Sequence, residues 1–466
     1  MQETETTALD RAHAHARAFL ESLDCRPAGS PASAEALRKG FFRPLADEGV
    51  DAAQVIDELV AAADPGLHGS TGGRFFAWVV GGAVASSVAA DWLTSVWDQN
   101  AGAFAVSPAA AIVEEAAGVW LKDLLGLPAE ASFAMVTGCQ MAHVTCLMTA
   151  RHKLLEDRGW DVEQDGLFGA PKIRILTSDQ HHASLDRSVR IVGLGAGSIE
   201  NLPTDKDARL PPQVLEEALA QSDAPTIVVL QAGELNTGAF DDFEALIPIA
   251  RRAGAWVHVD GAFGLWCAAS PKRRHLVRGV EGADSWATDG HKWLNVPYDS
   301  GLAFTVHPEA HKASMLQHAS YMVISPARDQ IMWNPEFSRR ARGFPIYAAL
   351  RELGRKGVAA LIDRTSDHCH ALTWGIGALP GAERLSDPQI NQGLVRFLDP
   401  RPGASEEDHD RRTEAVIAAI CATGEAFFSP VSWQGRRAMR ISVSNWRTTD
   451  ADVARVVEAV KGVLER

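Results

Sequence analysis

Residues 283–301 read ADSWATDGHKWLNVPYDSG and contain a single lysine, Lys292. This lysine lies between Trp286 and Trp293, so we expect it to follow a buried strand. Burial lowers the pKa of an amine toward the range in which it attacks a carbonyl carbon. The functional interpretation of Lys292 is a Schiff-base lysine, and the plain alternative is a surface lysine beside His291.

Two upstream segments add to this interpretation. Residues 256–264 read WVHVDGAFG and place Asp260 at the C-terminal end of an apolar strand, where open α/β sheets bind ligands. A carboxylate there requires a cation to offset its desolvation, and a protonated pyridine nitrogen is such a cation. Residues 135–143 read MVTGCQMAH, a strand, a glycine turn and a helix start of the kind that holds a phosphate. Together the segments supply a phosphate cup, a partner for a ring nitrogen and an amine.

The pattern between about residues 133 and 306 is typical of a parallel sheet, because short runs rich in Val and Ile alternate with helical stretches. The expected strands are residues 133–136, 173–177, 226–231, 256–259, 285–288 and 302–306. The expected N-terminal helices, which have no core of their own, are residues 8–22, 33–45 and 52–62. After about residue 354 the pattern changes to a smaller α+β domain. Its expected elements are a helix, apolar runs at residues 394–398 and 438–443, and an amphipathic helix over residues 450–464.

The composition is that of a globular protein, with 466 residues of which 46% are apolar and 22% charged. A net charge of −14 without any basic run argues against nucleic acid as a partner. No apolar stretch reaches the roughly 20 residues of a membrane span, and the acidic start is unlike a signal peptide, so we expect a cytoplasmic protein. Six cysteines without a CxxC pair are expected to be free thiols.

Two local patterns mimic ligand sites. Residues 192–198, VGLGAGS, are similar to a dinucleotide fingerprint, but prolines follow where a helix is required, so we predict a glycine-rich turn. Asp367, His368, Cys369 and His370 are adjacent on a predicted helix and point in different directions. For these four residues we predict a polar helix surface and no metal site.

The motifs stand in the order of a known family. The chain resembles the group II pyridoxal-phosphate-dependent amino acid decarboxylases, which include the aromatic amino acid and glutamate decarboxylases and have the aspartate aminotransferase fold (fold type I). The resemblance extends from about residue 75 to 447, and its most specific parts are residues 283–301, the HVDGAFG run and the SDQHHAS run at residues 178–184.

This resemblance implies an α/β fold with three parts. A large domain, residues 106–353, would contain a mostly parallel seven-stranded sheet and bind pyridoxal 5′-phosphate (PLP). A smaller C-terminal α+β domain would span residues 354–466. An N-terminal helical segment, residues 1–105, would pack on a partner subunit.

The resemblance also implies roles for single residues. Lys292 would bind the cofactor aldehyde, Asp260 would face the ring nitrogen, and Ala262 and His182 would cover the two ring faces. Tyr321, on a loop at residues 318–328, would donate the proton that replaces the carboxylate. The implied catalytic residues are Lys292, His182, Tyr321 and Asp260, and the implied cofactor-binding residues are Gly138, Cys139, Gln140, His182, Asn236, Asp260, Ala262, Asp289, His291 and Lys292.

Three departures from the family pattern matter. Cys139 and Gln140 stand where the family has Ser or Thr in the phosphate turn, so we expect backbone amides to contribute more of the binding. Residues 233–240, GELNTGAF, replace a Gly-Thr-Thr stretch and make Asn236 a candidate for the missing polar contact. Residues 80–82 are VGG where animal aromatic decarboxylases have a Pro-Thr pair, so the identity of the substrate does not carry over.

The expected reaction is decarboxylation of an L-amino acid to its amine by a homodimer with shared active sites. The aromatic-rich residues 74–108 are interpreted either as a pocket wall across the dimer interface or as ordinary core packing. One alternative reaction is decarboxylation-dependent oxidative deamination to an aldehyde. Another is a carbon–carbon lyase or an aminotransferase, for which Arg440 is the candidate carboxylate-binding residue. A binding scaffold without activity is the last alternative, which the joint presence of Lys292, Asp260 and His182 disfavours.

Overall fold

A computed structural model describes residues 2–316 and 327–466. Their contacts divide the chain into two compact units. The larger unit comprises residues 81–367 and 387–392, and the smaller unit comprises residues 1–80, 368–386 and 393–466. The three-part division expected from the sequence, with boundaries after residues 105 and 353, stays a prediction.

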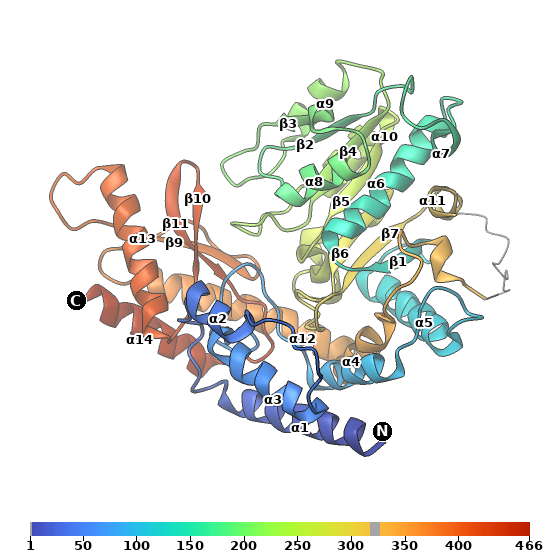
Figure 1. The fold of residues 1–466 in the computed structure, drawn as a ribbon. Coiled ribbons are helices and arrows are strands. Elements are labelled where there is room, and N and C mark those ends of the chain that lie inside the picture. Colours follow the sequence, from blue (N-terminus) through green and yellow to red (C-terminus); the bar gives the residue numbers. More distant parts are fainter. Residues whose placement is uncertain (1, 317–326) are drawn as a thin grey trace. The chain divides into compact units, whose positions relative to one another are not determined.

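The larger unit is built on a seven-stranded sheet with the order β1-β7-β6-β5-β4-β2-β3 (Figure 1). Strand β7 is antiparallel to β1 and β6, and the other neighbours run parallel. Every residue of β1, β4, β5, β6 and β7 is buried, as expected for a sheet covered on both faces. The strands are β1 (Ser132–Val136), β2 (Arg174–Ser178), β3 (Ile199–Leu202), β4 (Thr226–Gln231), β5 (Trp256–Asp260), β6 (Ser285–Asp289) and β7 (Gly301–Thr305).

Six of these strands were predicted, each to within one residue at either end. The seventh strand of the implied sheet, β3, was not located, because it has four residues, only one of them buried, and therefore lacks an apolar run. The glycine-rich stretch before it forms the predicted turn, with Gly193 and Gly195 at φ of 82° and 79° and a short 3-10 helix (Ala196–Ser198). No dinucleotide-type helix follows it.

Helix α6 (Cys139–Glu156) follows β1 after a two-residue turn and packs on β1, β5, β6 and β7. This arrangement confirms the predicted strand, glycine turn and helix start. The long helix α12 (Gly343–Gly377), whose residues 343–367 belong to the larger unit and 368–377 to the smaller, is interrupted at Gly354, whose φ of 57° favours glycine. The other helices of the larger unit are α4 (Ala85–Trp97), α5 (Pro108–Leu125), α7 (Val162–Asp165), α8 (Ala183–Ile191), α9 (Pro212–Leu219), α10 (Phe243–Arg252) and α11 (Pro308–Met315).

The smaller unit has a four-stranded sheet with the order β10-β11-β9-β8 and an apolar core that includes Phe76, Ile420 and Val456. The predicted runs at residues 394–398 and 438–443 overlap β9 and β11, each ending one residue past its strand, whereas β8 and β10 were missed because neither carries a continuous apolar run. Its elements are α1 (Gln2–Ser22), α2 (Ala34–Phe41), α3 (Ala52–Ala63), β8 (Ala382–Arg384), β9 (Gln392–Phe397), α13 (Glu406–Thr423), β10 (Ser429–Trp433), β11 (Arg436–Ser442) and α14 (Asp450–Leu464).

Two further expectations have clear outcomes. All six cysteines are free thiols, as predicted. The prediction of a polar helix surface was wrong for His368 and Cys369, which are buried in the smaller unit: His368 Nε2 lies 3.0 Å from Asp450 Oδ1, and Cys369 belongs to the apolar core. Among the described helices, none has the length and apolar character needed to cross a bilayer.

Candidate active site

Lys292 lies just after β6, beside a carboxylate. Its Nζ is 3.0 Å from Oδ2 of Asp289, the last residue of β6. The lysine side chain is 22% exposed and that of Asp289 is 2% exposed, so the pair faces a partly open site. Nζ also lies 5.9 Å from the ring centre of Phe263. Lys292 therefore follows a buried strand, as its neighbours in sequence predicted.

The pKa of Lys292 is raised, so the expectation of a lowered pKa was wrong. Burial does act to lower this pKa, but the carboxylates of Asp289 and Asp260 favour the charged amine and outweigh the burial. The sequence showed the apolar neighbours of the lysine but not how close the carboxylate lies. Lys292 accordingly carries a proton that has to leave before its amine can react with a carbonyl carbon.

His291 lies beside Oδ1 of Asp289, the carboxylate oxygen that does not face Lys292. His291 Nδ1 accepts a hydrogen bond from Ser300 N at 3.1 Å, so the proton of the neutral ring is on Nε2, which lies 3.3 Å from Asp289 Oδ1. Burial lowers the pKa of His291, in keeping with a neutral ring. Tyr298 stacks on this imidazole with ring centres 4.4 Å apart. Asp289 is therefore fixed at Oδ1 and presents Oδ2 to Lys292.

Asp260 is the last residue of β5 and is 9% exposed. Its Oδ1 accepts hydrogen bonds from Ala262 N at 3.2 Å and from the Cys139 thiol at 3.9 Å, and its Oδ2 lies 3.4 Å from His143 Nε2. Burial acts to raise the pKa of Asp260, but the neighbouring His143, His182 and Lys292 outweigh that effect, and the pKa is well below its ordinary value. Asp260 is thus an ionised carboxylate at the C-terminal edge of the sheet, as predicted from the strand pattern.

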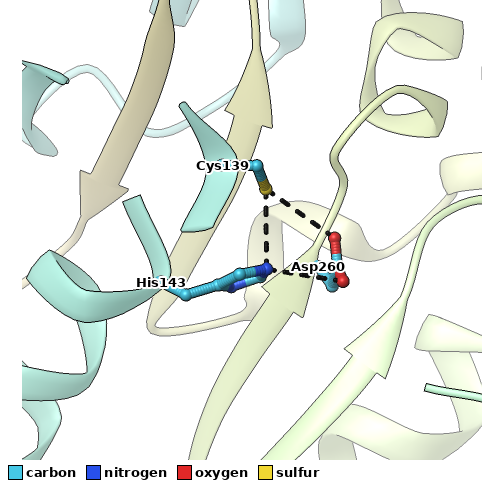
Figure 2. Close-up of side chains that lie close together, drawn as sticks. All are labelled: Cys139, His143 and Asp260. Carbon is cyan, nitrogen blue, oxygen red and sulfur yellow. Dashed lines mark hydrogen bonds and ion pairs between the residues drawn. The ribbon is translucent and has the colours of Figure 1, made fainter. Parts of the chain in front are cut away.

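Cys139, His143 and Asp260 come together at one point (Figure 2). Cys139 Sγ lies 3.5 Å from His143 Nε2, and the three polar atoms are within 4.8 Å of one another. Burial raises the pKa of Cys139 well above its ordinary value, so the thiol keeps its proton and acts as a donor. We interpret the cluster as the support of the Asp260 carboxylate.

The first turn of α6 is suited to an anion. Gly138, the residue before the helix, makes no side-chain cap, and Cys139 N donates to Asp289 Oδ1 at 2.6 Å. A Cβ on Gly301 would lie 2.3 Å from the backbone of Gly138, so β7 begins directly against this turn. Ser300 Oγ, one residue earlier, is buried and has no hydrogen-bond partner among the described residues. A phosphate would find helix N–H groups and a spare hydroxyl here.

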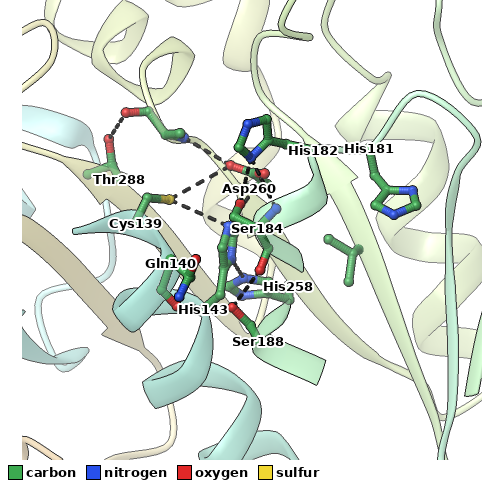
Figure 3. A network of polar contacts seen from close by, with 12 residues as sticks. Cys139, Gln140, His143, His181, His182, Ser184, Ser188, His258, Asp260 and Thr288 are labelled. Carbon is green, nitrogen blue, oxygen red and sulfur yellow. Dashed lines mark hydrogen bonds and ion pairs between the residues drawn. The ribbon is translucent and has the colours of Figure 1, made fainter. Parts of the chain in front are cut away.

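Two further candidates lie at the same edge of the sheet. His182 is the N-cap of α8, where Nδ1 accepts a hydrogen bond from Ser184 N at 3.2 Å. Its ring is exposed, and Figure 3 shows it next to Asp260. Gln140 lies in the first turn of α6, and its backbone oxygen accepts a hydrogen bond from Ser188 Oγ at 3.1 Å.

Among the described residues of the larger unit, Asn236 makes its hydrogen bonds away from this cluster. Asn236 is buried in a turn around Glu234, to which its Nδ2 donates at 2.7 Å, and its Oδ1 makes no hydrogen bond within the described chain. Tyr321 lies outside the described residues. Arg440 is buried in β11 of the smaller unit.

Four contributors were missed from the sequence: His143, His258, Ser285 and Ser300. Two of them had a usable signal. His143 is four residues after Cys139, which places both on one side of α6, and His258 is two residues before Asp260, which places both on one face of β5. Ser285 and Ser300 had no usable signal in the sequence, because their roles depend on partners that are distant along the chain.

The class of protein follows from three features at one edge of the sheet: a lysine after one strand, a carboxylate at the end of another and a helix start without a side-chain cap. This combination is typical of a PLP-dependent enzyme of fold type I. The comparisons narrow this class. The model of the family described as "Pyridoxal-dependent decarboxylase conserved domain" matches residues 37–398. The chain therefore belongs to the pyridoxal-dependent decarboxylases.

Relatives agree with this assignment. An aromatic-L-amino-acid decarboxylase of Bacillus atrophaeus is 24% identical and is matched over 96% of this chain and 92% of its own length. An L-2,4-diaminobutyrate decarboxylase of Rhizobium meliloti is 27% identical over 80% of this chain and 74% of its own. A structure of Oryza sativa TDC with PLP and tryptamine superposes with a TM-score of 0.92 at 22% identity, covering 100% of this chain and 98% of the other.

The predicted fold type I architecture, the PLP cofactor and the class of reaction, decarboxylation of an amino acid, are thereby confirmed. The structure of Rhodiola rosea 4-hydroxyphenylacetaldehyde synthase also superposes, with a TM-score of 0.87 at 19% identity and 99% of this chain covered. At that identity the likeness shows the fold alone.

Proposed function

We propose that this chain releases carbon dioxide from an L-amino acid and forms the amine, using Lys292, Asp260, His182 and the first turn of α6. The observation that carries the proposal is the Lys292–Asp289 pair, 3.0 Å apart at the same sheet edge as the ionised Asp260. When bound, PLP supplies an electron sink for the electron pair left when the bond to the carboxylate carbon breaks.

The residues present fit this cofactor. Lys292 Nζ would hold the aldehyde carbon and Asp260 the ring nitrogen. The N–H groups of the first turn of α6 and the unpartnered Ser300 Oγ would hold the phosphate. Ala262 and His182 would cover the ring faces, since Ala262 N donates to Asp260 Oδ1 and the ring of His182 lies beside the same carboxylate.

Asp260 contributes most when charge develops. The carboxylate is ionised and held by Ala262 N and His143, so it would keep the ring nitrogen of bound PLP protonated. This support would matter more in the transition state than in the ground state, because a protonated ring nitrogen is what would make bound PLP an electron sink. We therefore assign Asp260 a larger effect on turnover than on cofactor affinity.

Amine is the proposed product because Tyr321 stands at the position of a proton donor on the loop expected to close over the site. A phenol O–H protonates the substrate carbon, whereas an aldehyde requires dioxygen to capture it first. Closure of such a loop also excludes water. Aldehyde synthesis is the alternative outcome of the experiment below.

The proposed working form is a cytoplasmic homodimer. Helix α4 exposes Trp92, Leu93, Val96 and Trp97, four large apolar side chains within two turns. Monomeric proteins rarely leave contiguous apolar patches of this kind open to water. A second copy of the chain is the occupant that we propose for this face.

The test is Lys292→Ala, assayed with PLP and a panel of L-amino acids. We expect the visible absorbance of the bound cofactor and the release of carbon dioxide to be lost while the far-ultraviolet circular dichroism is retained. Lys272→Ala is the control, because that lysine is 67% exposed in the same unit and pairs only loosely with Asp367, at 3.9 Å. Turnover by Lys292→Ala at the wild-type rate would refute the proposal, and aldehyde with hydrogen peroxide from the wild type would refute the amine product.

A further inference from the structure

Behind Asp260 lies a line of buried polar side chains (Figure 3). His143 Nε2 is 3.4 Å from Asp260 Oδ2, and His143 Nδ1 is 2.8 Å from His258 Nε2. His258 Nδ1 is 2.8 Å from Ser285 Oγ, which accepts a hydrogen bond from Trp256 Nε1 at 2.9 Å. His143, His258 and Ser285 are all 0% exposed, so water does not take part in these contacts.

The fold assembles this line from three elements. His258 and Asp260 alternate along β5 and share one face, and Ser285 of β6 is the register partner of His258. Helix α6 packs on the same strands and supplies His143. The four residues therefore meet only when β5, β6 and α6 are packed together.

The direction of proton donation is set where the line meets Asp260. At the far end, Trp256 Nε1–H is a donor only, so Ser285 Oγ accepts from it and has its own proton available for His258 Nδ1. His258 then carries its proton on Nε2 and donates to His143 Nδ1, which leaves the proton of His143 on Nε2. At the other end, a bare nitrogen lone pair facing the Asp260 carboxylate would be repelled, so the same tautomer is required there.

We propose that Trp256, Ser285, His258 and His143 form a one-way hydrogen-bond chain that presents a neutral N–H to Asp260, with His143 as a positioning residue for this carboxylate. The inference rests on the proposed role of Asp260 at the ring nitrogen. Burial lowers the pKa of His258 to about 3, so this ring stays neutral under ordinary conditions and the line does not relay protons from solvent.

The consequence concerns charge. A neutral donor stabilises the Asp260 carboxylate without placing a full positive charge against it, so the protonated ring nitrogen becomes its main counter-charge. The titratable and charged groups that face Asp260 are Cys139, His143, His182 and Lys292, with Asp289 beyond Lys292.

The decisive variants are His143→Gln and His143→Asn. The glutamine amide nitrogen reaches the place of Nε2 and keeps the donor to Asp260, whereas the asparagine amide reaches only the place of Nδ1 and loses it. We expect His143→Asn to lower kcat by about 10- to 100-fold, the scale for residues that support a ligand-binding side chain. KM should change by less than about threefold, and His143→Gln should recover most of kcat. Thr145→Val, two residues along α6, is the control, since among the described residues its hydroxyl bonds only to Met141 O.

The second readout needs no turnover. The dissociation constant of deoxypyridoxine phosphate, which lacks the aldehyde and so does not involve Lys292, is measured on the apoenzyme between about pH 8 and pH 5.5. In His143→Asn the raising effect of burial on the pKa of Asp260 is offset less, because only His182 and Lys292 still lower this pKa, so Asp260 takes up a proton more readily as the pH falls. The dissociation constant of His143→Asn, divided by that of the wild type, should therefore increase as the pH falls. The corresponding ratio for His143→Gln should stay near one.

Indistinguishable Gln and Asn variants would overturn the inference, because a packing role does not depend on which atom carries the amide. If His143→Asn does not fold, Ser285→Ala tests the end of the hydrogen-bond chain that is far from Asp260. At low pH, Ser285→Ala should raise the ratio of the dissociation constants of variant and wild type, by a smaller factor. No change there would also overturn the inference. An Asp260→Asn variant with wild-type turnover would instead refute the proposed function, so the two failures are distinct.

Discussion

Replacing Asp289 by Asn should make Lys292 easier to load with cofactor near neutral pH. The carboxylate oxygen is 3.0 Å from Nζ and almost fully buried, and it raises the pKa of the amine. An opposite charge at this range shifts a pKa by about one to three units, so the variant should lower the pKa of Lys292 by at least about one unit. Only the neutral amine forms a bond to the aldehyde carbon, so loading at pH 7 should accelerate at least about tenfold.

The assay follows the visible absorbance gained by the apoenzyme after PLP is added, as a function of pH. In the wild type the rate should rise about tenfold per pH unit below the pKa of Lys292, and in Asp289→Asn it should level off at lower pH. Removing the charge of Asp289 also reduces its repulsion of the phosphate of PLP. Repeating the assay with pyridoxal, which lacks the phosphate, separates that reduced repulsion from the change in the pKa of Lys292. Asp91→Asn is the control, since Asp91 pairs with Arg340. Identical pH profiles for wild type and Asp289→Asn with pyridoxal would refute the reasoning.

Three further predictions concern turnover and assembly. Asp260→Asn should lower kcat by at least about 10²-fold but change PLP affinity much less, as measured by steady-state kinetics and cofactor titration; a loss below tenfold would place the electron sink elsewhere. Tyr321→Phe should lower amine formation by roughly 10²-fold and raise aldehyde and hydrogen peroxide, and an unchanged amine yield would identify another donor. The wild type should sediment as a dimer of the 50.1 kDa chain and Val96→Glu as a monomer; an active wild-type monomer would contradict the proposed assembly.

Local patterns were enough to locate most of the sheet. The runs that became β4 and β5 are mostly apolar and rich in β-branched or aromatic residues, so their position depends little on distant contacts. Strand β3 has no such run and is recognisable as a strand only through its pairing with β2.

The sequence by itself located the residues to which we assign the chemistry: Lys292, Asp260 and the turn before α6 lie in short segments whose order along the chain is distinctive. Tertiary structure alone decided the state of these groups. The raised pKa of Lys292 depends on a carboxylate 3.0 Å away, and the ionised Asp260 depends on His143 from a different element. The physical reason is that charge and hydrogen bonding act over a few ångströms in space, and residues 143, 258 and 285 become neighbours only when α6, β5 and β6 pack together.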